Sequence, residues 1–514
     1  MSFRPGGAAW TARRFSPLVL AVALLSCHRD RQSAAVVLAS GADLQSMNSV
    51  ITTHPLARQV QRYVLLTTLA RYDSTLALEP YLARSWAWSA DSAELTFQLH
   101  MGVGWHDGRP TTARDVAFTL GLALDSTVGY PRRRDLADLR EAVALDDSTV
   151  LLRFSARQRR FPDVLTDLAI LPAHLLADVA PTEIRHARWN ERPVGNGPFR
   201  FVRHDPNRRW VFEANPAFPP SLGGRPRLDR LVVAVVDEPM TKLAALTAGE
   251  LDFAGIQPAH ADFVRRDPDL AVVDYPLFFS YAVVFNARRP PFDRVEVRRA
   301  LGLALDRTAI VSGYLFGFGE PAAGPRSPDA LSGGPRPPLG PPGGDPRAPL
   351  GPPGGDPSAA DAPGARGDAP IYAPGRARAI LGDTLAFELV TVGSGEAALE
   401  QMIQQQLARI NVKVTIRQLE LATFLERVQT GHEFDAAVMG ISGDREGGYL
   451  RSLLDLTGLP VPASGVDLFR YYADSVPVSF LYHARGVQGM NRRIDGVRMD
   501  LRGELPTVAR WVAR

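Results

Sequence analysis

The chain has 514 residues, of which 45% are hydrophobic and 22% charged, so it holds enough apolar material for a large core and is not disordered throughout. Its 58 basic and 55 acidic residues leave a formal net charge of +3, and no basic block stands out, which argues against a nucleic-acid groove. The single cysteine, Cys27, excludes disulfides within the chain and cysteine-based zinc sites.

The first 27 residues have the pattern of a sorting signal. Arg13 and Arg14 precede an apolar run over 18–25, which is far shorter than the roughly 20 residues of a spanning helix. The tetrapeptide Leu24-Leu25-Ser26-Cys27 resembles a bacterial lipobox, in which the cysteine is lipidated. We predict a lipoprotein signal over 1–27, lipidation of Cys27 and anchoring at a membrane in the cell envelope or periplasm. An ordinary signal peptide with an incidental cysteine is the alternative.

The segment 230–254 predicts a strand–helix–strand unit. Residues 230–236 form a β-branched run that is typical of a buried strand. Apolar residues over 240–247 follow helical spacing, Gly249 ends the helix, and 251–254 returns as a short strand.

A composition break follows between Pro321 and Pro370, where 26 of 50 residues are Gly or Pro. Proline removes backbone donors and glycine raises chain entropy, so this stretch is not expected to form a packed core. We predict a disordered surface insertion over 321–370.

Strand and helix patterns alternate again after the insertion. The expected strands cover 387–391, 412–416 and 434–439, and the expected helices cover 399–410 and 424–428. Such alternation favours α/β lobes with largely parallel or mixed sheets. Because one α/β region lies on each side of the segment near Phe285, we expect two lobes with a cleft between them.

No enzyme motif is present in the chain. It lacks the His-Glu-x-x-His zinc motif, a phosphate loop and the Gly-x-Ser-x-Gly elbow, so no cofactor and no metal site are expected. A hydrolase built from distant residues remains an alternative that this pattern does not support.

Aromatic residues gather in one extended run that contains Phe278, Phe279, Tyr281 and Phe285. Core packing is the simplest interpretation of such a run. Tyr281 is the member that we expect to face the cleft, because its hydroxyl needs a hydrogen-bond partner.

Several ordered blocks carry a family resemblance. They lie at 69–73, 79–89, 95–100, 103–118, 193–199, 243–252 and 291–307, and include Trp105-His106-Asp107-Gly108 and Gly195-Asn196-Gly197-Pro198-Phe199. In this order they make the sequence similar to the solute-binding proteins of ABC transporters, in family 5, which binds peptides, nickel and related solutes.

The resemblance implies a two-lobed periplasmic-binding-protein-like α/β fold of type II, with an extra small domain and a hinge between the lobes. The expected boundaries are 28–50, 190–284 and 485–514 for lobe I, 51–189 for the extra domain, and 285–484 for lobe II. A solute shifts such a protein toward its closed form, because only that form contacts the solute from both lobes. The implied protein is a monomer and not an enzyme; it captures a peptide and delivers it to an ABC transporter permease.

The resemblance also implies site residues. Asp444, in the segment Gly440 to Arg445, corresponds to an aspartate that pairs with the peptide α-ammonium, and Arg445 is a candidate for a carboxylate. The remaining ligand-binding candidates are Tyr281, Asn286, Met47 and Asn48. The block His106-Asp107-Gly108 is expected to be a structural turn before a helix, with Thr111 or Thr112 as the N-cap.

One departure from the family pattern lies near the C-terminus. Residues 471–475 run almost directly into 476–482, where relatives carry tens of residues of helix, so we expect a thinner lobe II with exposed apolar surface. Binding of another solute, such as a nickel chelate or a sugar, and a repurposed fold that acts as an envelope sensor or interaction protein are the alternatives. The scattered histidines give nickel no support.

Overall fold

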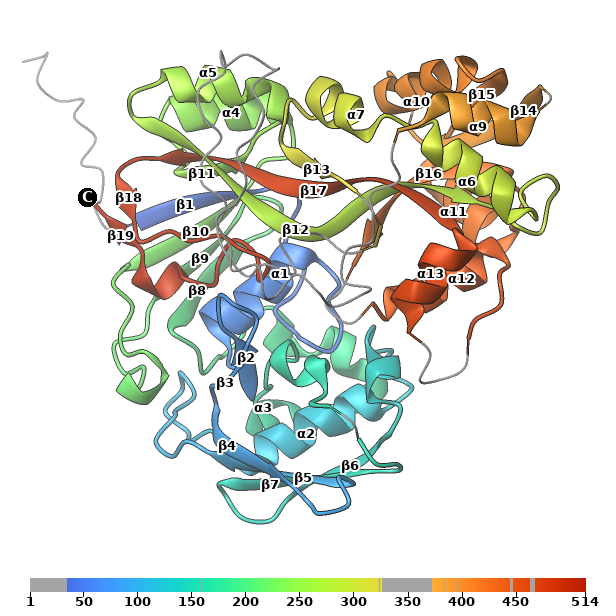
Figure 1. Cartoon of the computed structure of the whole chain (residues 1–514). Coiled ribbons are helices and arrows are strands. Elements are labelled where there is room, and N and C mark those ends of the chain that lie inside the picture. Colours follow the sequence, from blue (N-terminus) through green and yellow to red (C-terminus); the bar gives the residue numbers. More distant parts are fainter. Residues whose placement is uncertain are drawn as a thin grey trace, which may run out of the picture.

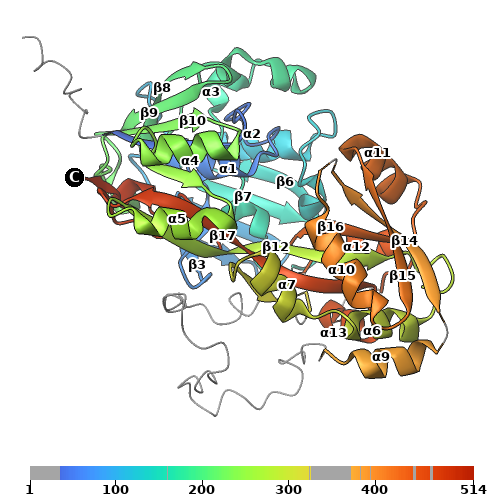
Figure 2. The same cartoon turned by 90° about the horizontal axis from the view of Figure 1, so that it is seen from above.

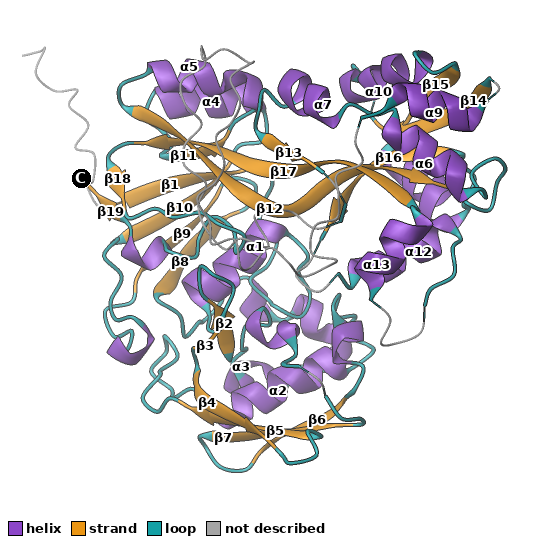
Figure 3. Cartoon of the chain, in the orientation of Figure 1, coloured by secondary structure: helices purple, strands orange, loops and turns teal. Residues whose placement is uncertain are grey.

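The computed structural model describes residues 35–158, 160–322, 324–325, 372–382, 384–393, 395–443, 447–462 and 467–514. Cys27, Asp444, Arg445 and nearly all of the Gly/Pro-rich segment lie outside the described residues. Helices cover both faces of one long sheet, and a smaller domain lies below it (Figure 1, Figure 3).

A mixed sheet of eleven strands runs through the described part of the molecule. Its order is β15 (Val412–Leu419), β14 (Leu385–Val392), β16 (Ala436–Ser442), β12 (Leu270–Phe285), β17 (Val478–Asn491), β11 (Phe253–Gly255), β1 (Ala35–Ser40), β10 (Arg230–Val235), β9 (Arg209–Ala214) and β8 (Phe199–Asp205), with β13 (Gly319–Pro321) paired to β17. The strands β8 to β11 and β1 belong to the first lobe, and β14 to β16 belong to the second. The α/β fold with two lobes is confirmed, but the two lobes share one sheet.

Two long strands join the lobes. β12 and β17 pair antiparallel over most of their length and run side by side from one lobe to the other (Figure 2). Their register shifts between Pro276 and Ser280, and the part of β12 from Phe279 onward pairs with β16 of the second lobe. The pairing therefore changes lobe about six residues before the expected boundary at 285.

The strand–helix patterns on both sides of the crossing are confirmed. β10 and β11 both pair parallel with β1, and α4 (Pro239–Thr247) connects them. In the second lobe, β14 is parallel to both β15 and β16, with α10 (Ala398–Ala408) and α11 (Leu421–Leu425) as connections.

Each face of the second-lobe sheet has its own core. Helices α6 (Val295–Leu303), α7 (Arg307–Tyr314), α9 (Pro374–Leu381) and α10 cover one face, and α12 (Tyr449–Thr457) and α13 (Leu468–Ser475) cover the other. In the first lobe, α4 and α5 (Ala261–Arg266) lie on one side, and α1 (Pro55–Val60) lies on the other (Figure 1).

The small domain continues the core of the first lobe. Its antiparallel sheet has the order β4 (Ala83–Trp88), β5 (Glu94–Leu99), β7 (Thr149–Phe154) and β6 (Leu139–Ala144), and it packs beside α2 (Ala113–Leu124), α3 (Ala173–Leu176) and the hairpin of β2 (Ala70–Tyr72) and β3 (Leu78–Pro80). One continuous cluster of buried side chains contains both Phe97 of β5 and Phe253 of β11. Thr112 is the N-cap of α2, as expected, and its N–H donates to Asp115 at 2.8 Å.

Two of the blocks that carry the family resemblance, 103–118 and 193–199, meet in the junction between the small domain and the first lobe. The His106 N–H donates to the Gly195 carbonyl at 2.7 Å, and the His106 Nε2 lies 3.0 Å from the Gly197 carbonyl. Asn196 accepts from the Thr67 N–H at 2.9 Å. These contacts give the His106 block the structural role that the resemblance implies.

Burial lowers the pKa of His106 to about 4, although the Gly197 carbonyl opposes the shift. The folded chain therefore holds this imidazole neutral, and the unfolded chain protonates first as the pH falls. We expect stability to drop by about 3 kcal/mol between pH 6.5 and pH 4 from this group alone. His106→Gln should remove most of that difference in melting experiments at the two pH values, with exposed His186→Gln as the control. An unchanged pH dependence in His106→Gln would contradict this assignment.

A buried arginine holds the end of α13 beside the start of β17, in the region that we expect to be shortened. α13 ends at Ser475, Val476 is left-handed with φ 43°, and β17 begins at Val478. The Arg298 guanidinium donates to the carbonyls of both Ser475 and Val476. Tyr472 on α13 is 3% exposed within the second core of this lobe. Tyr472 is therefore one aromatic residue of this region that is not exposed, and the thinner lobe II stays a prediction.

Candidate ligand-binding site

Polar side chains hold the two crossing strands together where the lobes meet. Ser280 and the His483 Nδ1 are 2.8 Å apart, and both residues are buried. Arg485 on β17 donates to Asp274 on β12 at 2.6 Å and lies 3.6 Å from Glu320 on β13. Charge-assisted contacts of this kind fix the relative position of three strands where the two lobes meet.

Tyr281 lies on β12 just beyond the register shift. Its half-buried ring stacks on Tyr482 at 5.1 Å between ring centroids, and Phe279 meets it edge-on at 5.6 Å. Burial raises the pKa of the Tyr281 hydroxyl, and the charge of Glu400 adds to the effect. The ring packs against the core under α7 and α10 and is partly buried there.

Asn286 follows β12 and is fully buried. Its amide donates to the carbonyls of His432 and Phe434, both at 2.9 Å, and its Oδ1 accepts from the Arg288 N–H at 3.2 Å. Each polar atom of the side chain therefore already has a protein partner. The structure places Asn286 inside the second lobe, where it fixes the end of β12.

Met47 and Asn48 lie in the segment after β1, and both are fully buried. Asn48 donates to Asn190 at 3.1 Å and accepts from the Val50 N–H at 3.2 Å. These two side chains belong to the interior of the first lobe. Gln45, two residues before Met47, is exposed and has φ 65°.

Sequence reasoning missed the residue that anchors this segment. The Asp43 carboxylate accepts from the Trp210 indole at 2.8 Å, from His204 at 2.9 Å and from the Asn207 N–H at 2.6 Å. Partial burial would raise the pKa of Asp43, but these hydrogen bonds outweigh it and hold the pKa at about 2. Asp43 is therefore ionised, and it ties the segment after β1 to the β8–β9 hairpin. A separation of more than 160 residues hid this contact from local pattern reasoning.

The end of β16 approaches the crossing strands from the second lobe. The Gly443 N–H donates to the Phe278 carbonyl at 2.8 Å. A side chain at Gly440 would stand 2.4 Å from the Phe279 ring, so a larger residue here would require that ring to move. Asp444 and Arg445, which follow directly, lie outside the described residues.

One cavity of about 490 Å³ is present elsewhere, between the small domain and the C-terminal segment. Its lining residues come from 63–81, 198, 218–224 and 496–510, so none of them belongs to the second lobe.

Within the described ranges, no His, Cys, Asp and Glu side chains gather as a group of three that could hold a metal ion. No helix in that part of the chain has the length and apolar character of a membrane crossing.

Two lobes on a shared sheet, a pair of crossing strands and a small domain attached to the first lobe define the periplasmic-binding-protein class. The family model of the bacterial extracellular solute-binding proteins, family 5, matches residues 77–454, and the chain belongs to this family.

Relatives and solved structures agree with this assignment. Di/tripeptide-binding protein 2 of Pseudomonas aeruginosa is 28% identical over 468 residues, which cover 84% of this chain and 81% of the relative. Proteins from Brucella species match at 31% identity over 242 residues, so the chain spans about half the length of these relatives.

Among solved structures, the oligopeptide-binding protein AppA of Bacillus subtilis, in complex with a nonapeptide, has a TM-score of 0.71 at 23% identity. The alignment covers 93% of this chain and 99% of AppA. CtaP of Listeria monocytogenes, an ABC transporter substrate-binding protein, has a TM-score of 0.77 at 18% identity over 93% of this chain and 99% of CtaP. These structural similarities show that the chain has the same fold as these proteins.

Proposed function

We propose that this chain is an extracytoplasmic lipoprotein of an ABC import system. It captures oligopeptides or dipeptides in a cleft between its two lobes and delivers them to a membrane permease. The observation that carries the proposal is the pair of long strands, β12 and β17, which joins the lobes and fixes them at one polar point. Family membership and the peptide-binding relatives support the choice of solute.

The mechanism follows from this connection. Two lobes joined by two strands open and close by small changes at the register shift between Pro276 and Ser280. A solute that contacts both lobes in the closed form, and one lobe in the open form, stabilises the closed form by that difference in contacts. Binding, rather than chemistry on the solute, is the activity. Lipid on Cys27 keeps the protein near the permease.

Asp444 is the proposed anchor for the peptide α-ammonium, and Arg445 for a carboxylate. The hydrogen bond from Gly443 to Phe278 holds the backbone one residue before Asp444 beside the crossing strands. A carboxylate at that point pairs with an ammonium group through charge-assisted hydrogen bonds. Tyr281, on the neighbouring strand, supplies an aromatic surface in the same region.

The test compares peptides with free and acetylated N-termini. Once a binding di- to pentapeptide is found, Asp444→Ala is expected to weaken the free peptide about tenfold or more by calorimetry, and to leave the acetylated peptide nearly unchanged. Asp474→Asn, which removes a carboxylate from the same lobe, is the control. Equal weakening of both peptides would remove Asp444 from the ammonium role.

A further inference from the structure

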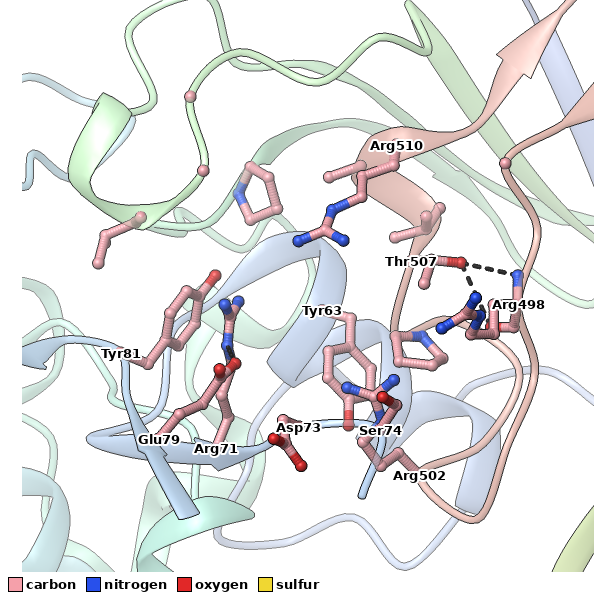
Figure 4. A pocket seen from close by; sticks show the side chains of 18 of the residues that line it. Tyr63, Arg71, Asp73, Ser74, Glu79, Tyr81, Arg498, Arg502, Thr507 and Arg510 are labelled. Carbon is pink, nitrogen blue, oxygen red and sulfur yellow. Dashed lines mark hydrogen bonds and ion pairs between the residues drawn. The ribbon is translucent and has the colours of Figure 1, made fainter. Parts of the chain in front are cut away.

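The cavity beside the C-terminal segment is separate from the region between the lobes. Its walls are the β2–β3 hairpin, the turn at 218–224 and the segment 496–510 (Figure 4). A volume of about 490 Å³ is in the range that holds small ligands. A molecule in this cavity would touch only the first lobe, the small domain and the C-terminal segment.

The polar lining of the cavity is mainly cationic. It contains the four arginines Arg71, Arg498, Arg502 and Arg510, but only two acidic residues, Asp73 and Glu79. The close-up shows Arg510 reaching from the C-terminal segment over the gap between Tyr81 and Tyr63, with Arg71 and Glu79 on the other side (Figure 4).

Two of these arginines are held in place by protein partners. Arg71 donates to Glu79 at 2.5 Å and lies 4.4 Å over the Tyr81 ring. Arg502 makes two hydrogen bonds to Asp500, at 2.6 and 2.9 Å, and a third to the Tyr72 carbonyl at 3.1 Å. Such partners give each guanidinium a fixed orientation, which lowers the entropy cost of binding a ligand.

The side chains of the other two arginines are not held by such partners within the part of the chain that the structure describes. Among the described residues, neither Arg498 nor Arg510 forms an ion pair with its side chain. The Asp73 carboxylate is turned to its own loop, where one oxygen accepts from the Thr75 N–H, the Thr75 hydroxyl and the Ala77 N–H. An anion in the cavity would therefore meet four guanidinium groups and two carboxylates, of which Glu79 is paired with Arg71 and Asp73 accepts hydrogen bonds from its own loop.

The backbone brings the two unpaired arginines near each other. Ile494 and Asp495 pair with Ala513 and Val512, which closes the C-terminal segment into a loop. A side chain at Gly496, where φ is 78°, would stand 2.7 Å from the Arg510 carbonyl. Arg498 and Arg510 lie on the two arms of this closed loop.

We propose that this cavity is a second ligand site that binds a small soluble polyanion with two or more carboxylate or phosphate groups. Guanidinium groups pair with both kinds of oxyanion through parallel hydrogen bonds, which makes several arginines in one cavity selective for such groups. The tyrosine rings and buried apolar side chains such as Phe218 and Val508 form the remaining wall.

The test is calorimetry of the whole protein with citrate and with pyrophosphate at low ionic strength, where screening is weak. At least one of the two probes is expected to bind saturably at one site per chain. The double variant Arg498→Gln/Arg510→Gln should weaken that binding about tenfold or more. The control variant Arg114→Gln/Arg492→Gln removes two exposed arginines outside the cavity, and it should bind as the wild type does.

Absence of saturable binding for both probes would overturn the proposal. Equal weakening in the cavity variant and in the control variant would overturn it as well, since the effect would then come from net charge. Asp444→Ala should leave polyanion binding unchanged, because Asp444 follows β16 in the second lobe. A loss of polyanion binding in Asp444→Ala would place the anion between the lobes and contradict a separate site.

Discussion

Replacing Gly195 by alanine is expected to lower the free energy of unfolding by at least about 3 kcal/mol. A Cβ at this position would stand 2.0 Å from the Leu65 carbonyl oxygen and 2.8 Å from the Leu65 Cδ1. Because the Leu65 carbonyl belongs to the backbone, no change of side-chain rotamer can remove this clash. The Gly195 carbonyl also accepts from the His106 N–H, so any shift of the chain breaks the junction between the small domain and the first lobe.

The control for this variant is Gly121→Ala. Gly121 lies within α2, and a Cβ there would meet no heavy atom within 4 Å. Alanine in an open helical position is expected to stabilise the helix by up to about 1 kcal/mol. Urea unfolding of the two variants should therefore move in opposite directions. If the Gly195→Ala protein unfolds at the same urea concentration as the wild type, the close packing of Leu65 against Gly195 would be contradicted.

The second large effect is expected from Arg298→Met. Arg298 is 2% exposed, and its guanidinium donates to the carbonyls of Phe292, Asp293, Ser475 and Val476. Methionine fills part of the volume but leaves these carbonyls without their donor. Because an unsatisfied buried acceptor costs about 1–3 kcal/mol, we expect a loss of about 4 kcal/mol, concentrated in the second lobe.

Arg299→Met is the matched control, because Arg299 is exposed and makes one hydrogen bond, to the Asp474 carbonyl at 2.8 Å. Melting curves and limited proteolysis should separate the two variants. Arg298→Met is expected to melt earlier and to be cut near the end of α13, while Arg299→Met should behave nearly as the wild type does. Equal melting of both would contradict the role of Arg298 in holding the end of α13 beside β17.

Local patterns predicted most of the regular elements. The β-branched run at 230–236 and the helical spacing at 399–410 correspond to β10 and α10, since each pattern depends on residues close in sequence. The aromatic run near Tyr281 predicted only the end of β12. Pro276 interrupts the pattern, and it lies where the register shifts, which is where a sheet tolerates proline.

The contacts that position the candidate site could not be predicted in the same way. Asp43 meets Trp210, and Arg485 meets Asp274, across 167 and 211 residues respectively. Local sequence periodicity cannot predict contacts between residues that are so far apart in the chain. Asn286 and Met47 were singled out by their place along the chain, but burial decides whether a side chain faces a ligand, and both side chains are fully buried.

The most direct test of peptide capture is a thermal-shift measurement of the purified protein against pools of di- to pentapeptides, with sugars and nickel as separate pools. A peptide at about 100 times its dissociation constant is expected to add about 2.7 kcal/mol to the stability of the folded chain. We expect a clear rise in melting temperature with at least one peptide pool. A cooperative melt that no peptide pool shifts would contradict peptide capture by this protein.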